Sequence, residues 1–369
     1  MARGRTLRGM ESLTWSQALA WRMRRQFLDP IGDAPAVRIV GRLAGVQAQV
    51  ASAAELAVAV RQTSPRDREV EKALWDERSL LKTWAMRGTL HLLPVDEAGA
   101  YLALCATMRN WEKPSWQRAS GVTPAELEVI AAAAADVLGD GSPRSREELS
   151  AEIIESTGSG HLAELLGSGW GTLLKPLAWW GVLCYGRSRG NRVTFTAPVH
   201  HIPGWRGLPP VEEAARTVIR AFLGAHGPAS AEMFDAWLTR GTSRKKELRG
   251  WFAALGDELT VVEVEGTPMY VLTDHLAEMH AIEPTSAVRL LGGFDQYVLG
   301  AGTSATYVLP AEHRAKVSRQ AGWISPVVIH GGRVAGVWAA KDGAIEVTAW
   351  EDVPEGSLGA ETARLAALS

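Results

Sequence analysis

Two glutamines, Gln47 and Gln49, stand one residue apart in an alanine-rich and valine-rich run, GRLAGVQAQVASAAELAVAVR at residues 41–61. The run has no acidic residue before Glu55, which is typical of a buried segment. A buried amide without hydrogen-bond partners costs about 1–3 kcal/mol, so two of them need a reason. An amide is a poor base, but its oxygen can orient a water molecule and its dipole can stabilise charge.

The backbone around the pair decides whether the two amides can act together. In a helix, side chains two residues apart point about 200° apart, whereas in extended backbone they face the same side. Gly45 is placed to end a helix that begins near Pro35, and Ser52 with Glu55 fits the capping box of a new helix. We therefore expect a short link between two helices, with both amides facing one cleft. The alternative is a continuous helix with the amides on different sides.

One order of elements recurs along the chain. Three further capping boxes mark helix starts, at Thr14 to Gln17, Thr123 to Glu126 and Ser145 to Glu148. After residue 123 we expect helices at 124–138, 146–157 and about 169–179, then the extended runs VLCYGR and NRVTFTAP. From residue 210 the order returns, with three helices and the runs LTVVEVEG and MYVLTD. A degenerate copy is expected near the N-terminus, with helices at 15–28, 36–44, 53–62 and 67–76 and the runs KTWAMRG and TLHLLP.

Three helices followed by a two-stranded hairpin are the winged form of the helix-turn-helix. The predicted fold class is therefore mainly α with β wings (α+β). We expect tandem winged helix-turn-helix units at residues 12–120, 121–205 and 206–286, followed by a small C-terminal β-barrel or sheet at 287–369. Winged helices commonly bind DNA, but they also serve as protein-binding or architectural modules, so the pattern alone leaves both functions open.

Two clusters of basic residues are candidates for DNA contact. The first is the hairpin tip RSRGNR, with Arg187, Arg189 and Arg192. The second is the first turn of a helix in the later unit, where the helix dipole disfavours cations, with Arg244, Lys245 and Lys246. The alternatives are an ordinary solvated turn and a solvated helix end. Arginine supplies 31 of the 39 basic residues, which fits either phosphate contact or a compositional bias of the coding genome.

Composition and missing motifs exclude several classes of protein. Two cysteines, Cys105 and Cys184, are too few for a disulfide framework or a four-cysteine metal site. Neither a phosphate-cradling glycine motif nor an HExxH motif occurs, and His200 with His201 offers only a weak metal possibility. We therefore expect no metal and no organic cofactor. Because neither a secretory signal nor an apolar run of membrane-spanning length occurs, we expect a cytoplasmic protein.

Five segments together resemble one known family: LTWSQALAWRMRRQFLDP, GVQAQVASAAELAVAVR, LLKTWAMRGTLHLLP, LLGGFDQYVLG and PVVIHGGRVAGVW. Over about residues 12–352 the chain resembles the AlkZ family of winged-helix DNA glycosylases, whose motif is a glutamine, an aliphatic residue and a second glutamine. The two glutamines of that motif match Gln47 and Gln49. A related branch, resembling the bacterial YcaQ enzymes, carries aspartate at the second position, and this sequence does not.

The resemblance implies a monofunctional DNA glycosylase that acts as a monomer on double-stranded DNA carrying alkylated or crosslinked purines. Its implied reaction is hydrolysis of the N-glycosidic bond of N7-alkylated purines, including unhooking of azinomycin-type interstrand crosslinks. An N7-alkylated purine is cationic and departs as a neutral base without an acid, so amides suffice for the remaining tasks. We expect Gln49 to position the water, and Gln47 to share that water or hold the sugar.

A crosslinked base cannot be swung fully out of the duplex. We therefore expect an open cleft approached from the minor groove, with the wing of Arg187, Arg189 and Arg192 as the groove element. The competing class is a non-catalytic winged-helix DNA-binding regulator, which would normally be a twofold dimer with two half-sites. A lyase step through a Schiff-base lysine and a role in self-resistance to a DNA-alkylating natural product are not decided by the sequence.

Overall fold

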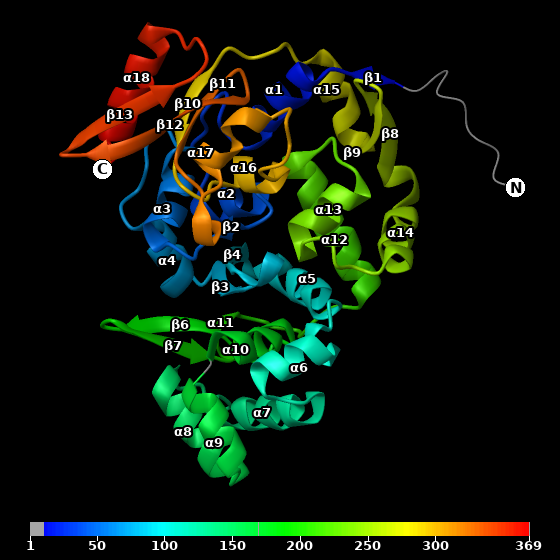
Figure 1. The fold of residues 1–369 in the computed structure, drawn as a ribbon, viewed down its shortest axis with the longest axis vertical. Helices are drawn as coiled ribbons and strands as arrows, with labels where there is room; N and C mark the ends of the chain where they lie inside the picture. Colours follow the sequence, from blue (N-terminus) through cyan, green and yellow to red (C-terminus); the bar gives the residue numbers. More distant parts are fainter. Residues whose placement is uncertain (1–10, 169, 369) are drawn as a thin grey trace, which may run out of the picture.

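The computed structural model describes residues 11–168 and 170–368 as a mixed α/β protein, about half helical, with four small sheets in this part of the chain (Figure 1). Three groups of elements repeat one order: a helix, a short strand, further helices and a two-stranded hairpin. In the first two groups the short strand pairs antiparallel with the second strand of the hairpin, and in the third group a single antiparallel bridge takes its place. The predicted order of three helices followed by a hairpin recurs in the described chain, but the helix predicted at 15–28 as part of the first copy packs with the third group instead.

The first group carries the glutamine pair. Its elements are α2 (Ala36–Arg42), β2 (Val46–Gln47), α3 (Ala51–Ala59), α4 (Glu69–Trp75), β3 (Leu80–Trp84) and β4 (Leu90–Pro94). The three strands form a sheet in the order β2-β4-β3, which places β2 at one edge. The short 3-10 helix η1 (Met86–Gly88) joins β3 to β4 at the tip of their hairpin.

The second group lies at the lower end of the molecule in Figure 1. Its elements are α7 (Pro124–Val137), β5 (Arg144–Ser145), α8 (Arg146–Thr157), α9 (Gly160–Ser168), α10 (Trp170–Trp179), β6 (Cys184–Arg189) and β7 (Arg192–Thr196). The predicted helix at about 169–179 starts on residue 169, which lies outside the described residues. The linking helices α5 (Val95–Ala106), α6 (Pro114–Ser120) and α11 (Pro198–His201) connect this group to its neighbours.

The third group lies beside the first and also takes up the start of the described chain. Its elements are α12 (Val211–His226), α13 (Ala231–Thr239), α14 (Lys245–Ala254), β8 (Leu259–Val264) and β9 (Thr267–Leu272). A single bridge between Ala229 and Tyr270 replaces the short strand. β1 (Ser12–Leu13) adds to this sheet by pairing parallel with β8, and α1 (Trp15–Arg25) packs against α15 (Leu276–Ala281) and α12.

The C-terminal region forms an antiparallel sheet of β10 (Val288–Leu291), β11 (Val327–His330), β12 (Arg333–Lys341) and β13 (Ala344–Ala349), in that order. β10 and β13 are its edges, so hydrogen bonds do not close it into a barrel in the described part of the chain. α16 (Gln296–Ala301), α17 (Arg314–Val317) and α18 (Glu355–Ala366) accompany this sheet. The remaining short 3-10 helices are η2 (Asn110–Glu112), η3 (Gly256–Glu258), η4 (Thr273–His275), η5 (Ala311–His313) and η6 (Gln320–Gly322).

The predicted helix starts are confirmed where the local signal is strongest. Thr14, Thr123 and Ser145 each cap a helix in a complete capping box. The box predicted at Ser52 is wrong, because α3 begins at Ala51 with an extended Val50 as its N-cap and without a side-chain cap. Both cysteines are buried and unpaired, as expected of small core residues. Among the described residues, we find no helix long and apolar enough to cross a membrane.

Candidate active site

Gln47 ends β2, where the chain turns from a helix into a sheet. α2 stops at Arg42, and Ala44 and Gly45 then adopt positive φ values of 56° and 93°. A Cβ on Gly45 would lie 2.9 Å from atoms of Leu93 and Met86, so the turn has no room for a side chain. Gln47 itself is only 9% exposed. A tight turn thus delivers the first glutamine to the edge of a buried sheet.

Gln49 lies two residues further on, in the link between β2 and α3. The backbone N–H of Ala48 donates to the carbonyl of Leu90 at 2.7 Å, which extends the strand pairing just beyond Gln47. Gln49 is exposed, in contrast to Gln47. Within the described residues, neither side-chain amide has a hydrogen-bond partner. The predicted helix-to-helix link is therefore confirmed, the continuous helix is excluded, and both amides are available to other groups.

A row of buried polar residues crosses the sheet from Gln47. Gln47 is paired with His91 on β4, and His91 is paired with Thr83 on β3. Residues directly opposite one another share a face, with Cβ atoms about 4.5–5.5 Å apart. His91 and Thr83 are fully buried. Three polar side chains thus lie side by side in a part of the sheet that is otherwise apolar.

His91 has one ring nitrogen satisfied and the other free. Its Nδ1 lies 3.0 Å from the carbonyl oxygen of Thr89, and because a carbonyl only accepts, Nδ1 carries the proton. Nε2 is therefore an acceptor, and it has no partner in the described structure; the hydroxyl of Thr83 also has none. Burial, together with the nearby Arg87, lowers the pKa of His91 to about 3, so the ring is neutral.

Sequence reasoning did not single out His91 and Thr83, which lie on the same sheet face as Gln47. The available signal was the presence of polar residues inside two apolar strands, LLKTW and LHLLP. That signal does not say which residues lie opposite one another, because the register is set by tertiary pairing.

The wing arginines are exposed and partly engaged with acids. Arg187 lies 3.2 Å from Asp76 and 3.5 Å from Glu71, which ties the wing to the first group. Arg189 pairs with Glu148 on α8. Arg192 is exposed at the other side of the hairpin tip. Exposed pairs of this kind contribute little, about 0–1 kcal/mol, so a phosphate can displace the acids.

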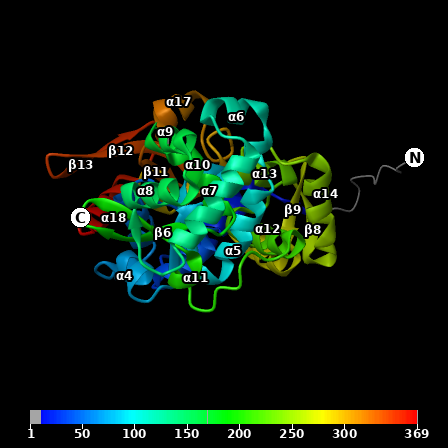
Figure 2. The same ribbon diagram turned by 90° about the horizontal axis from the view of Figure 1, so that it is seen from below.

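The second basic cluster surrounds the start of α14. Arg244 is its N-cap and lies 3.2 Å from Glu247, while Lys245 and Lys246 are exposed in the first turn. The tip of the β6–β7 hairpin and α14 lie on opposite sides of the molecule in both views (Figures 1 and 2). The structure therefore does not bring the two predicted basic clusters together.

The histidine pair considered for a metal has other partners. His200 Nε2 lies 3.1 Å from the carbonyl of Gly139, and His201 Nε2 lies 3.1 Å from the carbonyl of Leu80. Within the residues that the structure describes, no group of three or more histidine, cysteine or acidic side chains could hold a metal ion.

The match to a known family defines the class of protein. The chain belongs to the AlkZ-like DNA glycosylases: the family described as DNA glycosylase AlkZ-like matches residues 40–368. It is therefore a DNA glycosylase, which decides against the non-catalytic regulator. The chain is 52% identical over 340 residues to the interstrand DNA cross-link repair glycosylase of Streptomyces sahachiroi, covering 92% of this chain and 91% of that protein.

The solved structure of Streptomyces sahachiroi DNA glycosylase AlkZ is similar to this chain throughout. It superposes with a TM-score of 0.93 at 50% sequence identity and covers 96% of each chain. The resemblance seen in the sequence is thereby confirmed at the level of family and fold.

Proposed function

We propose that this glycosylase hydrolyses the N-glycosidic bond of N7-alkylated purines in duplex DNA, including purines in azinomycin-type interstrand crosslinks. The observation that carries the proposal is the pair of amides without partners in an extended link, Gln47 at the sheet edge and Gln49 exposed. A cationic purine leaves as a neutral base, so the site needs a positioned water and a stabilising dipole rather than a strong acid. The relative named as a cross-link repair glycosylase supports the crosslinked substrate.

The two glutamines take different roles in this proposal. Exposed Gln49 holds the attacking water beside the sugar, and its side-chain oxygen stabilises the positive charge that develops at C1′. When DNA is bound, Gln47 turns an amide N–H towards Nε2 of His91, which has no partner in the described structure, and its own oxygen accepts from the same water. His91 and Thr83 are positioning residues in this scheme, because they act through Gln47. Water attacks C1′ as the glycosidic bond breaks, the bonding electrons neutralise the cationic base, and the attacking water loses its extra proton to solvent.

The repeated groups support a DNA-binding framework of three winged-helix units, the first beginning at α2 and running to about residue 120, the second at 121–205 and the third at 206–286 with β1 and α1 packed onto it, followed by the C-terminal region at 287–369. We place the wing of Arg187, Arg189 and Arg192 in the minor groove next to the lesion, and a second DNA contact at Arg244, Lys245 and Lys246. The protein acts as a monomer in the cytoplasm without a cofactor. Protection of a producing cell from its own DNA-alkylating product is the role that fits this substrate.

The proposal is tested with two duplexes, one carrying 7-methylguanine and one a bis-N7 crosslink. Each is incubated with enzyme under single-turnover conditions, and abasic sites are then cleaved with alkali. The wild-type protein is expected to release the modified base from both duplexes, and Gln47→Ala and Gln49→Ala are expected to lower the rate of release about 10²–10³-fold. Gln117→Ala, on α6, is the matched control. Unchanged excision by both active-site variants would remove the glutamines from the mechanism.

A further inference from the structure

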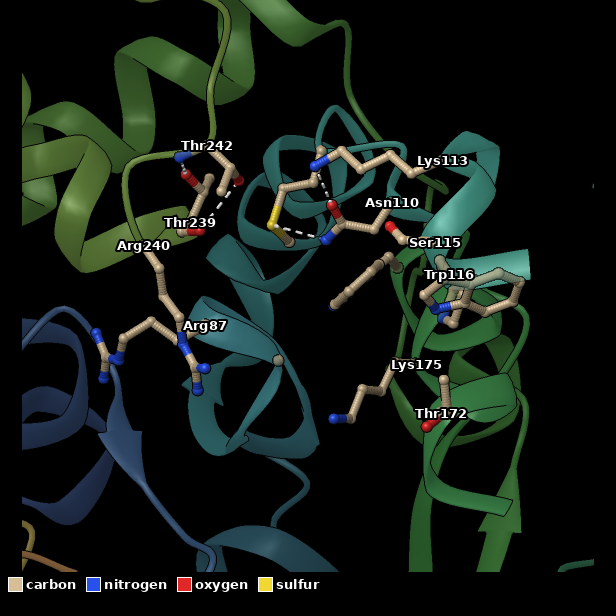
Figure 3. A pocket seen from close by; sticks show the side chains of 14 residues that line it. Arg87, Asn110, Lys113, Ser115, Trp116, Thr172, Lys175, Thr239, Arg240 and Thr242 are labelled. Atoms are coloured by element: carbon tan, nitrogen blue, oxygen red, sulfur yellow. Dashed lines mark hydrogen bonds between the residues drawn. The ribbon is translucent and has the colours of Figure 1, made fainter. Parts of the chain in front are cut away.

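A basic cavity of about 440 Å³ lies between the repeated groups, and neither Gln47 nor Gln49 lines it. Its cations come from segments far apart in the sequence: Arg87 from η1, Lys113 before α6, Lys175 from α10 and Arg240 after α13. Figure 3 shows Lys175 pointing towards the guanidinium groups of Arg87 and Arg240. We call this space the inter-unit basic cavity.

The charge in the inter-unit basic cavity is not balanced by the protein. The lining residues include four cations and no carboxylate. In the described part of the chain, none of the four forms an ion pair. Arg87 Nη1 donates to the carbonyl of Trp237 at 2.6 Å, but its buried Nη2 has no partner. Lys113 Nζ donates to Asn110 Oδ1 at 2.7 Å, which is a neutral acceptor.

The cations of the cavity disfavour one another's charged forms. Burial, together with Arg240, lowers the pKa of Arg87 to about 10 and also lowers the pKa of Lys175. Both shifts mean that the cationic forms are disfavoured where the residues lie. An anion bound among the three side chains would stabilise these forms and provide an acceptor for Arg87 Nη2.

We propose that the inter-unit basic cavity binds the phosphate group of a nucleotide. Arg87, Lys175 and Arg240 hold the phosphate, and exposed Thr172 adds a hydroxyl donor on the same wall. Trp116 also lines the cavity (Figure 3), and a base can stack on its indole, as in single-strand binding sites that combine cations with aromatic rings. The phosphate belongs either to a DNA strand or to a free nucleotide. Only the DNA-strand source rests on the proposed function.

The experiment measures binding by isothermal titration calorimetry to the full chain. The probes are a short single-stranded oligonucleotide, a deoxynucleoside monophosphate, the matching nucleoside without phosphate, and inorganic phosphate. The variant is Lys175→Gln with Arg240→Gln, and the charge-retaining variant is Lys175→Arg with Arg240→Lys. The matched control, Lys341→Gln with Arg206→Gln, removes the same two charges from exposed positions outside the cavity.

The neutral double variant is expected to bind the phosphate-bearing probes at least about tenfold more weakly per lost charge, whereas the matched control binds like wild type. The charge-retaining variant should recover most of the affinity. Oligonucleotide binding with competition from phosphate identifies a DNA strand, and binding of the monophosphate alone identifies a free nucleotide; both support the site. Equal affinity of the neutral variant and wild type for every probe, or equal binding of the nucleoside and its monophosphate, would overturn it.

If the cavity variants bind normally while the wild type excises 7-methylguanine, the cavity proposal fails and the proposed function stands. If phosphate binding depends on the cavity but the wild type excises no 7-methylguanine, the proposed function fails and the cavity proposal stands.

Discussion

In the proposed mechanism His91 is a residue of the site that no sequence motif marks. Its ring is buried and neutral, it lies opposite Gln47, and its Nε2 has no partner. A buried acceptor without a donor costs about 1–3 kcal/mol of folding free energy. A hydrogen bond that forms during the reaction explains why the acceptor is there, and the proposed donor is the side-chain amide of Gln47.

Replacing His91 by leucine separates a positioning role from a structural one. We expect kcat for excision of 7-methylguanine to fall about tenfold or more while KM for the duplex stays the same, because the change disorders Gln47 but touches no DNA. His91→Asn, which keeps an acceptor, should recover part of the rate. Thermal unfolding is the control, with a loss of about 1 kcal/mol for the bond to Thr89. A parallel fall of activity and stability in both variants would assign His91 to folding alone.

The lowered pKa of His91 makes the stability of the protein, but not kcat, depend on pH. The ring stays neutral in the folded protein down to pH about 3, so its titration adds no inflection to kcat between pH 5 and 8. The unfolded chain binds this proton near pH 6.5, so the contribution of His91 to stability is lost progressively as the pH falls from about 6.5 towards 3.

At the scale of elements, the turn between α2 and β2 determines where the glutamines lie. Gly45→Ala is expected to destabilise the protein by about 2–4 kcal/mol, since it adds a positive-φ penalty to overpacking against Leu93 and Met86. Gly343→Ala is the matched control, with φ of 78° and open space around it, and should lose only about 1–2 kcal/mol. Equal losses in urea unfolding would mean that close packing at Gly45 is unimportant.

The wing prediction concerns the β6–β7 hairpin. Reversing Arg187, Arg189 and Arg192 to glutamate should weaken duplex binding and reduce the slope of log affinity against log salt by about 3, since three phosphate contacts are lost. Fluorescence anisotropy over a salt series measures both quantities. Lys341→Glu, at the β12–β13 hairpin, controls for a charge reversal at a hairpin tip elsewhere. An unchanged affinity and slope would place the wing outside the groove.

Helix starts with local signals were predictable, and the features fixed by distant pairing were not. Thr14, Thr123 and Ser145 cap their helices with nearby side chains, and those contacts follow from spacing alone. Ser52 has the same spacing to Glu55, but pairing of β2 with β4 holds the chain extended up to Ala48, and α3 starts before Ser52. The Gln47–His91–Thr83 row and the inter-unit basic cavity depend on register and on packing between groups, which no short segment encodes.

At the scale of the whole molecule, a buried ion pair joins the glutamine region to the C-terminal region. Arg61, just beyond α3, lies 2.7 Å from Asp295, and both side chains are fully buried. Arg61 also donates to the carbonyls of Gln26 and Ala57, and Asp295 caps α16 by accepting from the N–H of Tyr297. Three of the segments that carry the family resemblance thus meet at Arg61.

Removing either partner leaves a buried charge without compensation. Arg61→Ala and Asp295→Ala should each lower the free energy of unfolding by about 3–5 kcal/mol, and the double variant should lose much less than the sum. The exposed pair of Lys341 and Glu346, 3.5 Å apart, is the matched control and should show a coupling of about 0–1 kcal/mol. Urea unfolding of both double-mutant cycles measures the difference. Additive losses at Arg61 and Asp295 would show that the two regions are held together by packing rather than by this pair.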